Sequence, residues 1–217
     1  MTHCLLFDSD GTLVDSEAIN TEALSDELAL YNIVEDKASL LTRYRGWQFK
    51  ALLEELSALH SVELDSHFET EFRDRASRYF ALKLEPVAHI HEVLLQLQQA
   101  KCVASNAPVN KLIQVLEKTD LSEFFNGNLF SAYDISSFKP EPTLFLHAAQ
   151  QMGFGAAKCI VIEDSEVGVQ AAMAAAMKCV HYKPGNNNAA NVTASNVVTI
   201  SSMLELPSAI AQLEMQN

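Results

Sequence analysis

The sequence predicts an α/β fold: a Rossmann-like, doubly wound parallel sheet core with an inserted all-helical domain. Short apolar segments recur along the chain without alternating polar residues, as expected for strands covered on both faces. Helical patterns separate these segments, which favours a parallel sheet with helices on both faces and right-handed crossovers. One long stretch, 17–84, has helical patterns and no convincing strand.

Six apolar runs are the predicted strands of the sheet. They are 4–7, 102–104, 127–130, 159–162, 179–182 and 197–200. Two helical patterns between them place apolar residues on one face. These are 89–100, with Ile90, Val93, Leu94 and Leu97, and 142–152, with Leu144, Phe145, Ala148 and Met152.

The stretch that lacks strands holds three helical patterns, 19–31, 49–60 and 68–80. In the second pattern, apolar residues form a continuous stripe made of Phe49, Leu52, Leu53, Leu56 and Leu59. This stretch leaves the sheet after the first strand and returns before the helix near His89. We therefore expect a core domain from 1–16 and 85–217, and a helical domain from 17–84.

The composition excludes several classes of partner. The chain has 217 residues and is 48% hydrophobic, which is enough for one large core or for a main domain with an insert. Its formal net charge of -13 repels phosphate backbones, so no nucleic acid partner is expected. No apolar run approaches the length of a membrane span, and no secretory signal pattern is present, so we expect a cytoplasmic protein with no membrane partner.

The four cysteines, Cys4, Cys102, Cys159 and Cys179, lie far apart in the sequence and form no CxxC pair. All four lie in or beside predicted strands. Buried, reduced thiols are therefore expected in place of a metal site or a disulfide framework.

Polar residues follow four of the predicted strands. Asp8 and Asp10 follow the first, and Ser105 and Asn106 follow the second. Lys139 precedes a proline between the third strand and the next helix, while Glu163 and Asp164 follow the fourth strand. Because ligands bind beyond the carboxyl ends of parallel strands, these groups are predicted to converge on one rim of the sheet.

The charges at this rim require a cation. Four ionised carboxylates with one lysine and one divalent cation leave a net charge of -1, and protonation of Asp10 makes it zero. Without the positive charges, the carboxylates would raise one another's pKa and repel an anionic substrate. The candidate metal ligands all offer hard oxygens in a compact site, which favours Mg2+ over zinc. They are Asp8, Asp10, Asp164 and Glu163.

The Asp8-Ser9-Asp10-Gly11 segment suits phosphoryl transfer. In extended backbone, residues two apart point to the same side, so one carboxylate can attack phosphorus while the other handles a proton. Aspartate can form an aspartyl-phosphate, which water then hydrolyses with Asp10 as the base. Gly11 permits the tight turn that brings Asp10 back over the site.

Four segments in this order resemble the motifs of the haloacid dehalogenase superfamily of aspartate-nucleophile phosphatases. They are FDSDGT, VASNA, FKPEP and VIEDS. The segments DGTLVDSE and KPEPTLF are similar to the branch that holds β-phosphoglucomutase and phosphoglycolate phosphatase. The run FSAYDISSFKPEPTLFLHAAQQM is similar to the bacterial 6-phosphogluconate phosphatases, which implies a small phosphorylated metabolite as the partner, a sugar phosphate or sugar-acid phosphate.

The resemblance also implies a role for each site residue. Asp8 would be the nucleophile and a metal ligand, and Asp10 the acid and base, with its backbone carbonyl on Mg2+. Asp164 would be a further metal ligand, and Glu163 would bind the ion directly or through water. Phosphate would be held by Ser105, Asn106 and Lys139. The helical domain would be a cap that closes over the substrate, and the protein would be a monomer or weak dimer.

Departures from the family pattern separate the alternatives. A sugar phosphomutase of the β-phosphoglucomutase type carries a histidine where this chain has Asn20, and tends to lack the threonine found here as Thr12. Both features argue against the mutase. A phospho-accepting receiver module also uses an acidic pocket, a hydroxyl and a lysine, but the helical insert and Asp10 disfavour it. Many relatives have glycine where this chain has Ala176, so we expect a different helix cap there.

Three cations of the helical domain, Arg43, Arg45 and Lys50, have two open interpretations. They belong either to a solvated face or to the part of the site that contacts the substrate.

Overall fold

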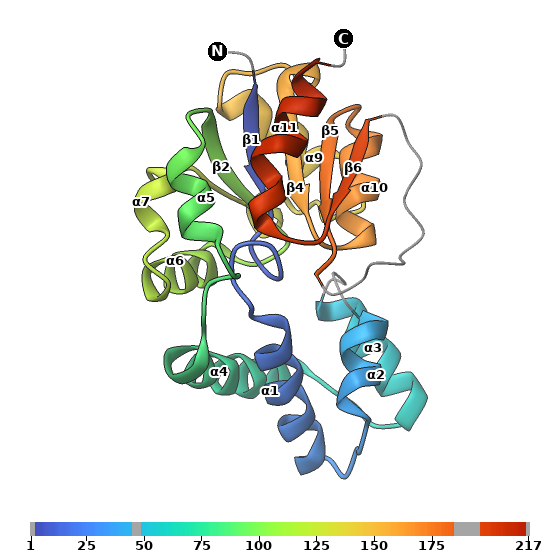
Figure 1. Cartoon of the computed structure of the whole chain (residues 1–217). Coiled ribbons are helices and arrows are strands. Elements are labelled where there is room, and N and C mark those ends of the chain that lie inside the picture. Colours follow the sequence, from blue (N-terminus) through green and yellow to red (C-terminus); the bar gives the residue numbers. More distant parts are fainter. Residues whose placement is uncertain (1–2, 45–48, 185–195, 216–217) are drawn as a thin grey trace. The chain divides into compact units, whose positions relative to one another are not determined.

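The computed structural model describes residues 3–44, 49–184 and 196–215 (Figure 1). The chain divides into two compact units. The core unit comprises Met1–Val14 and Pro86–Asn217, and the helical unit comprises Asp15–Glu85. Among the described residues, no helix combines the length and apolar character needed to cross a lipid bilayer.

The core unit is built on a six-stranded parallel sheet, which confirms the predicted fold class. Its strands are β1 (Cys4–Phe7), β2 (Ala100–Ser105), β3 (Leu129–Ser131), β4 (Cys159–Glu163), β5 (Lys178–Tyr182) and β6 (Val197–Ile200). The spatial order is β3-β2-β1-β4-β5-β6. Strand order therefore reverses between β1 and β4, and ligands of doubly wound sheets bind at such a switch point.

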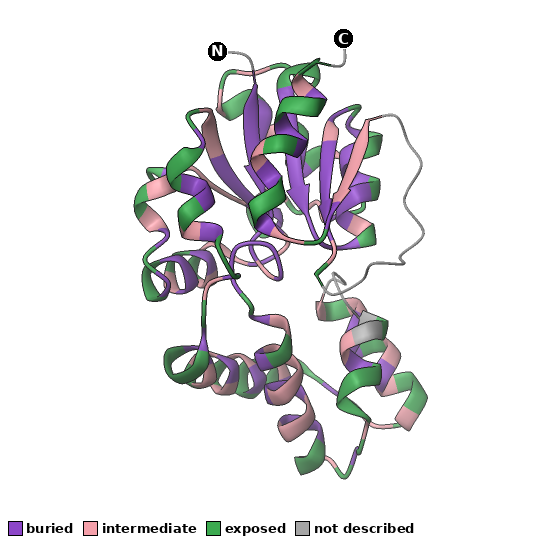
Figure 2. Ribbon diagram, viewed as in Figure 1, coloured by how far each residue is buried: buried purple, intermediate pink, exposed green. Residues whose placement is uncertain are grey.

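Helices cover both faces of this sheet (Figure 1). One face is covered by α5 (Ile90–Gln96) and α11 (Leu206–Met215), and the other by α9 (Thr143–Gln151) and α10 (Glu166–Ala174). All four residues of β1 are fully buried between these layers, in agreement with its unbroken apolar sequence (Figure 2). The remaining α-helices of the core unit are α6 (Val109–Lys118), α7 (Ser122–Phe125) and α8 (Ala132–Ile135).

The prediction for the cysteines is confirmed, because all four are free and buried. They lie in β1, β2, β4 and β5 and belong to one hydrophobic cluster with the apolar faces of α9 and α10. Here they act as small apolar core residues.

The helical unit contains α1 (Glu17–Leu30), α2 (Lys37–Tyr44), α3 (Phe49–His60) and α4 (Ser66–Lys83). The three predicted patterns correspond to α1, α3 and α4. Helix α2 was not predicted, because Leu40 is the one buried residue among the side chains of α2 that the structure describes, and a single residue gives no periodic stripe. Helices α1 and α4 pack against each other, and Tyr31, which directly follows α1, makes an edge-to-face contact with Phe68 of α4.

Two predicted element boundaries are corrected. The third strand starts at Leu129, since Asn126 and Gly127 adopt left-handed backbone angles that form a turn. The helix predicted over 89–100 ends at Gln96, because Leu97 is extended and Ala100 already pairs with Cys4 of β1. When apolar residues continue across a helix–strand junction, the sequence does not show where the spacing typical of a helix ends and the strand begins.

The expected change of cap at Ala176 is wrong. Ala176 adopts a left-handed conformation with φ 54°. Its N–H donates to the carbonyl of Met173, and the N–H of Met177 donates to the carbonyl of Ala172, both at 3.0 Å. These two bonds form a Schellman motif, the helix end that normally carries glycine. The chain therefore keeps the glycine-type cap and accommodates the strain of an alanine in it.

Replacing Ala176 with glycine is expected to stabilise the protein. A left-handed alanine costs about 1 kcal/mol, so removal of its Cβ should raise the midpoint of thermal unfolding by about 2–4 °C. Ala174 is a matched control, because it is exposed and lies within α10, where glycine is unfavourable. Thermal unfolding followed by circular dichroism should show A176G above and A174G below the wild type. A lowered midpoint for A176G would refute the strain argument.

Candidate active site

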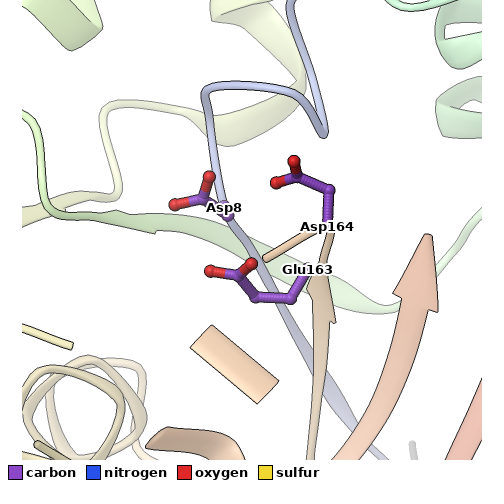
Figure 3. Close-up of side chains that lie close together, drawn as sticks. All are labelled: Asp8, Glu163 and Asp164. Atoms are coloured by element: carbon purple, nitrogen blue, oxygen red, sulfur yellow. The ribbon is translucent and has the colours of Figure 1, made fainter. Parts of the chain in front are cut away.

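Three carboxylates meet at the switch point of the sheet. Asp8 directly follows β1, Glu163 is the last residue of the neighbouring β4, and Asp164 follows it. One oxygen from each carboxylate lies within 4.8 Å of the others (Figure 3). All three residues are buried, so their charges need compensation from within the protein or from a cation.

Lys139 provides part of this compensation. Its Nζ lies 2.6 Å from Oδ1 of Asp8 and 2.6 Å from Oε1 of Glu163. The residue is buried, with 5% of its surface exposed, and its ammonium also lies 4.9 Å from the centre of the Phe145 ring. The structure therefore brings a loop lysine together with the ends of two strands. Lys139 and Asp8 are 131 positions apart in the sequence.

The environment alters the ionisation of this pair. Burial raises the pKa of Asp8 to about 7, against the opposing effect of the Lys139 charge. Burial disfavours the ammonium of Lys139, but the attraction of Asp8 and Glu163 outweighs it and raises the pKa of Lys139. Lys139 is therefore a permanent cation, whereas Asp8 changes charge near neutral pH unless a further positive charge lies beside it.

Glu163 is held by the start of α10. Its Oε2 accepts hydrogen bonds from the backbone N–H and the hydroxyl of Ser165, both at 2.8 Å. The Ser165 hydroxyl in turn accepts from the N–H of Gly168 at 3.1 Å, which caps the helix. A Cβ at Gly168 would overlap the Glu163 carboxylate, so the close contact requires glycine. The sequence places Ser165 after the fourth strand without indicating its role, and it gives no sign of a role for Gly168. The structure shows Ser165 as the N-cap of α10 and Gly168 in the first turn.

Asp164 is held by the segment that follows β1. Its Oδ1 accepts a hydrogen bond of 3.2 Å from the Thr12 hydroxyl. Gly11 has φ +79°, and a Cβ there would overlap the Asp164 carboxylate. The turn predicted at Gly11 is thus present. The structure shows a second reason why this position is glycine: the carboxylate of Asp164 lies too close to leave room for a side chain.

Ser105 and Asn106 lie at the end of β2. The Asn106 Oδ1 accepts from the backbone N–H of Lys139 at 2.9 Å, which orients the amide. Its Nδ2 is buried and makes no hydrogen bond within the described part of the chain. A buried donor of this kind is costly unless a ligand accepts from it, so it favours a ligand with an acceptor oxygen here. Ser105 is buried, and its Oγ accepts from the N–H of Ala107 at 3.2 Å.

Asp10 lies beside a second lysine that sequence reasoning missed. Nζ of Lys111, in the first turn of α6, lies 2.9 Å and 2.7 Å from the two carboxylate oxygens of Asp10. The charge count from the sequence omitted this lysine. With it, four carboxylates, two ammonium groups and one divalent cation are neutral while Asp10 stays ionised.

The three buried carboxylates fit a divalent cation. They supply hard oxygen ligands at close range, the type preferred by Mg2+ and Ca2+. The pKa of Asp8, which burial raises, also fits, because a neighbouring dication would restore the ionised form.

The structure describes the surroundings of two of the three cations of the helical unit. Arg43 forms an ion pair with Glu55, and Lys50 is exposed and 4.0 Å from Glu54. Arg45 lies outside the described residues. These pairs agree with a solvated face but leave the role of the three residues as a prediction.

Comparison with known proteins identifies the family. A family model for haloacid dehalogenase-like hydrolases matches residues 2–176. The chain belongs to this family. The resemblance of its four sequence motifs is thereby confirmed, and the carboxylate cluster of this hydrolase lies on two of them, FDSDGT and VIEDS.

Named phosphatases are among the relatives of this haloacid dehalogenase-like hydrolase. A 6-phosphogluconate phosphatase of Escherichia coli is 31% identical over 204 residues, 94% of this chain and 92% of the relative. A fructose-1-phosphate phosphatase of Escherichia coli is 27% identical over 82% of this chain and 95% of the relative. This chain is accordingly a phosphoric monoester hydrolase.

A solved structure has the same fold. A hydrolase of this family from Deinococcus radiodurans, with bound phosphate and sodium, is 26% identical and superposes with a TM-score of 0.75. The match covers 98% of this chain and 96% of that chain.

Proposed function

We propose that this protein is a Mg2+-dependent phosphatase that hydrolyses a sugar phosphate or sugar-acid phosphate through an aspartyl-phosphate. The observation that carries the proposal is the buried ammonium of Lys139 between Asp8 and Glu163, beside Asp164. This arrangement presents one carboxylate next to fixed positive charge, which suits attack on a phosphate dianion. The named phosphatase relatives support the substrate class.

Asp8 and Asp10 divide the chemistry in this proposal. An Asp8 oxygen forms a bond to phosphorus while the bond between phosphorus and the leaving oxygen breaks, and Asp10 donates the proton that the leaving oxygen needs. Water then attacks the phosphorus of the aspartyl-phosphate, Asp10 takes the proton, and the Asp8 carboxylate is regenerated as phosphate leaves. Thr12 and Gly11 fix the segment that carries both aspartates.

Other residues hold the transferring group. Lys139 neutralises charge on its oxygens, and the buried Nδ2 of Asn106 and the hydroxyl of Ser105 donate hydrogen bonds to it. The phosphate bound by the Deinococcus radiodurans hydrolase supports a phosphate site in this fold.

The metal ligands in this proposal are Asp8, Asp164 and the backbone carbonyl of Asp10. Glu163 binds the ion directly or through water, and in addition holds Lys139 in place. When bound, Mg2+ supplies positive charge that stabilises the ionised Asp8 and the charge of the phosphoryl group. The helical unit, 17–84 in the sequence-based division, is proposed to act as the cap that recognises the leaving group and excludes water.

Phosphate release from a panel of phosphorylated sugars, sugar acids and nucleotides tests the function. Turnover should require Mg2+, stop on chelation and resume on resupply. Activity that survives exhaustive chelation would contradict the metal assignment. A long-lived phosphoprotein with little turnover would favour the receiver module, and isomerisation dependent on a bisphosphate activator would favour the mutase.

Mg2+ affinity is expected to depend on pH through Asp8. Its pKa of about 7 in the metal-free protein means that below neutrality the ion must displace a proton from its ligand. Affinity should therefore be about tenfold weaker at about pH 6 than at about pH 8, measured by titration calorimetry on chelator-treated protein. D8N serves as the control, because it removes the titrating carboxylate and should lose this difference. Equal affinities for the wild type at both pH values would show that Asp8 does not ligate the ion.

A further inference from the structure

His181 is a buried histidine close to the active site that the proposed reaction does not use. It lies in β5, opposite Glu163 of β4 in the register of the two parallel strands. None of its surface is exposed. A buried imidazole is costly unless its ring nitrogens find hydrogen-bond partners, so an apolar residue would be more favourable here on packing grounds alone. The contacts of the ring therefore indicate why a histidine is present.

One ring nitrogen of His181 contacts the backbone of a proposed metal ligand. Its Nε2 lies 3.3 Å from the carbonyl oxygen of Asp164. A carbonyl oxygen can only accept a hydrogen bond, so Nε2 carries a hydrogen and donates it. The other nitrogen, Nδ1, is buried and has no hydrogen-bond partner in the part of the chain that the structure describes. The polar contact that accounts for this histidine is therefore its bond to Asp164.

The bond from His181 complements a contact that Asp164 makes through its side chain. The Oδ1 of Asp164 accepts a hydrogen bond from the Thr12 hydroxyl at 3.2 Å. His181 holds the backbone carbonyl of the same residue from the neighbouring strand β5. Asp164 lies just beyond Glu163, the last residue of β4 that pairs with β5. Two contacts from different segments of the core unit thus set the direction of the Asp164 carboxylate.

We propose that His181 is a positioning residue for Mg2+ binding: its hydrogen bond fixes the backbone of Asp164 and thereby holds the carboxylate ready for the ion. This deepens the proposed phosphatase function and rests on its assignment of Asp164 as a metal ligand. A carboxylate whose backbone can rotate must be ordered each time an ion binds, which weakens binding. In this proposal His181 contacts neither the ion nor the substrate.

Two substitutions of similar length separate the hydrogen bond from the packing of the ring. The amide nitrogen of glutamine is as many bonds from Cβ as Nε2 of histidine and can donate to the same carbonyl, whereas methionine has a methyl group there. Titration calorimetry with Mg2+ on chelator-treated protein should show an affinity for H181M about 10- to 100-fold below that of the wild type, the scale typical of residues that orient metal ligands. H181Q should stay within about threefold of the wild type, because it keeps the donor.

Kinetics should show the same division. Because His181 does not touch the reacting groups, H181M should raise the Mg2+ concentration needed for half-maximal phosphate release. It should leave kcat at saturating Mg2+ within about threefold of the wild type. A purely structural defect would lower the amount of active protein, and thus the apparent kcat, without changing the Mg2+ requirement.

Two further variants guard against general effects on folding. V180A removes buried apolar volume from the same strand on the other face of the sheet. It should lower the midpoint of thermal unfolding and leave the Mg2+ affinity unchanged. The amide of H181N ends one bond short of the carbonyl and should show the same loss as H181M, so the comparison with H181Q stands if H181M does not fold. Wild-type Mg2+ affinity in H181M or H181N, or an equal loss in H181Q, would overturn the proposal.

A substitution of Asp164 distinguishes failure of this role from failure of the metal assignment. D164N removes the charge of the proposed ligand and should weaken Mg2+ binding more than H181M does. If D164N weakens binding and H181M does not, Asp164 is a ligand and His181 has no part in positioning it. If the wild type binds no Mg2+, or D164N binds it as tightly as the wild type, the metal assignment itself fails and the role of His181 fails with it.

Discussion

Replacing Asp8 by asparagine is expected to lower turnover by roughly 10⁵-fold or more, the scale seen when a catalytic nucleophile is removed. The amide cannot form the bond to phosphorus, and it also removes one oxygen anion from the cluster with Glu163 and Asp164. Steady-state phosphate release with the preferred sugar phosphate measures the effect.

The fold should survive this substitution. Asp8 is buried with a pKa that burial raises, so a neutral amide of the same shape removes an unfavourable charge, and Lys139 retains Glu163 as a partner. Asp120 provides the matched control, because it is exposed in a left-handed turn that asparagine accommodates well. D120N should keep full activity. Normal hydrolysis by D8N would end the assignment of the nucleophile, and loss of cooperative unfolding would show that Asp8 has a structural role instead.

Replacing Lys139 by methionine is expected to damage both activity and stability. The side chains are similar in length, but methionine leaves the buried carboxylates of Asp8 and Glu163 without their cation. Breaking a buried ion pair from one side costs about 3–5 kcal/mol of folding free energy, and loss of this stabilising charge should lower kcat by about 10²–10³-fold. Urea unfolding of metal-free protein and phosphate release measure the two effects.

The stability loss should depend on pH. Without the charge of Lys139, the folded-state pKa of Asp8 rises further above its unfolded value. A raised carboxyl pKa makes folding less favourable as pH rises through it, so the destabilisation by K139M should be larger at about pH 8 than at about pH 5.

A second substitution serves as the control. E163Q removes one unpaired charge, so the double variant K139M/E163Q should recover part of the stability and none of the activity. If K139M unfolds with the wild-type free energy at both pH values, Lys139 does not compensate the cluster in solution.

The sequence was informative where one local pattern implied one structure. The unbroken apolar runs identified strands buried on both faces, and the parallel sheet followed from their alternation with helices. The rule that ligands bind at the carboxyl ends of parallel strands then brought Asp8, Lys139 and Glu163 into one site before any contact was known. Helix α2, with its single buried residue among those described, had no such pattern and was missed.

Contacts that depend on how side chains and backbone are placed in three dimensions could not be predicted from these patterns. Lys111 reads as an ordinary polar residue of an amphipathic helix, and only the packing of α6 beside the loop after β1 brings it to Asp10. In the sequence, Gly168 is merely an unfavourable residue for a helix. In the structure, the Glu163 carboxylate occupies the space that a Cβ at this position would need. At Ala176 the absence of glycine suggested another cap, but the two Schellman hydrogen bonds form nonetheless.

The sequence by itself determined the fold class, the order of the strand-end groups and the excess of acidic charge at the rim. Periodicity and strand polarity carry that information, because both are local properties of the chain. The tertiary structure alone decided which ammonium compensates which carboxylate, since ion pairing depends on distances of a few ångströms between residues up to 131 positions apart.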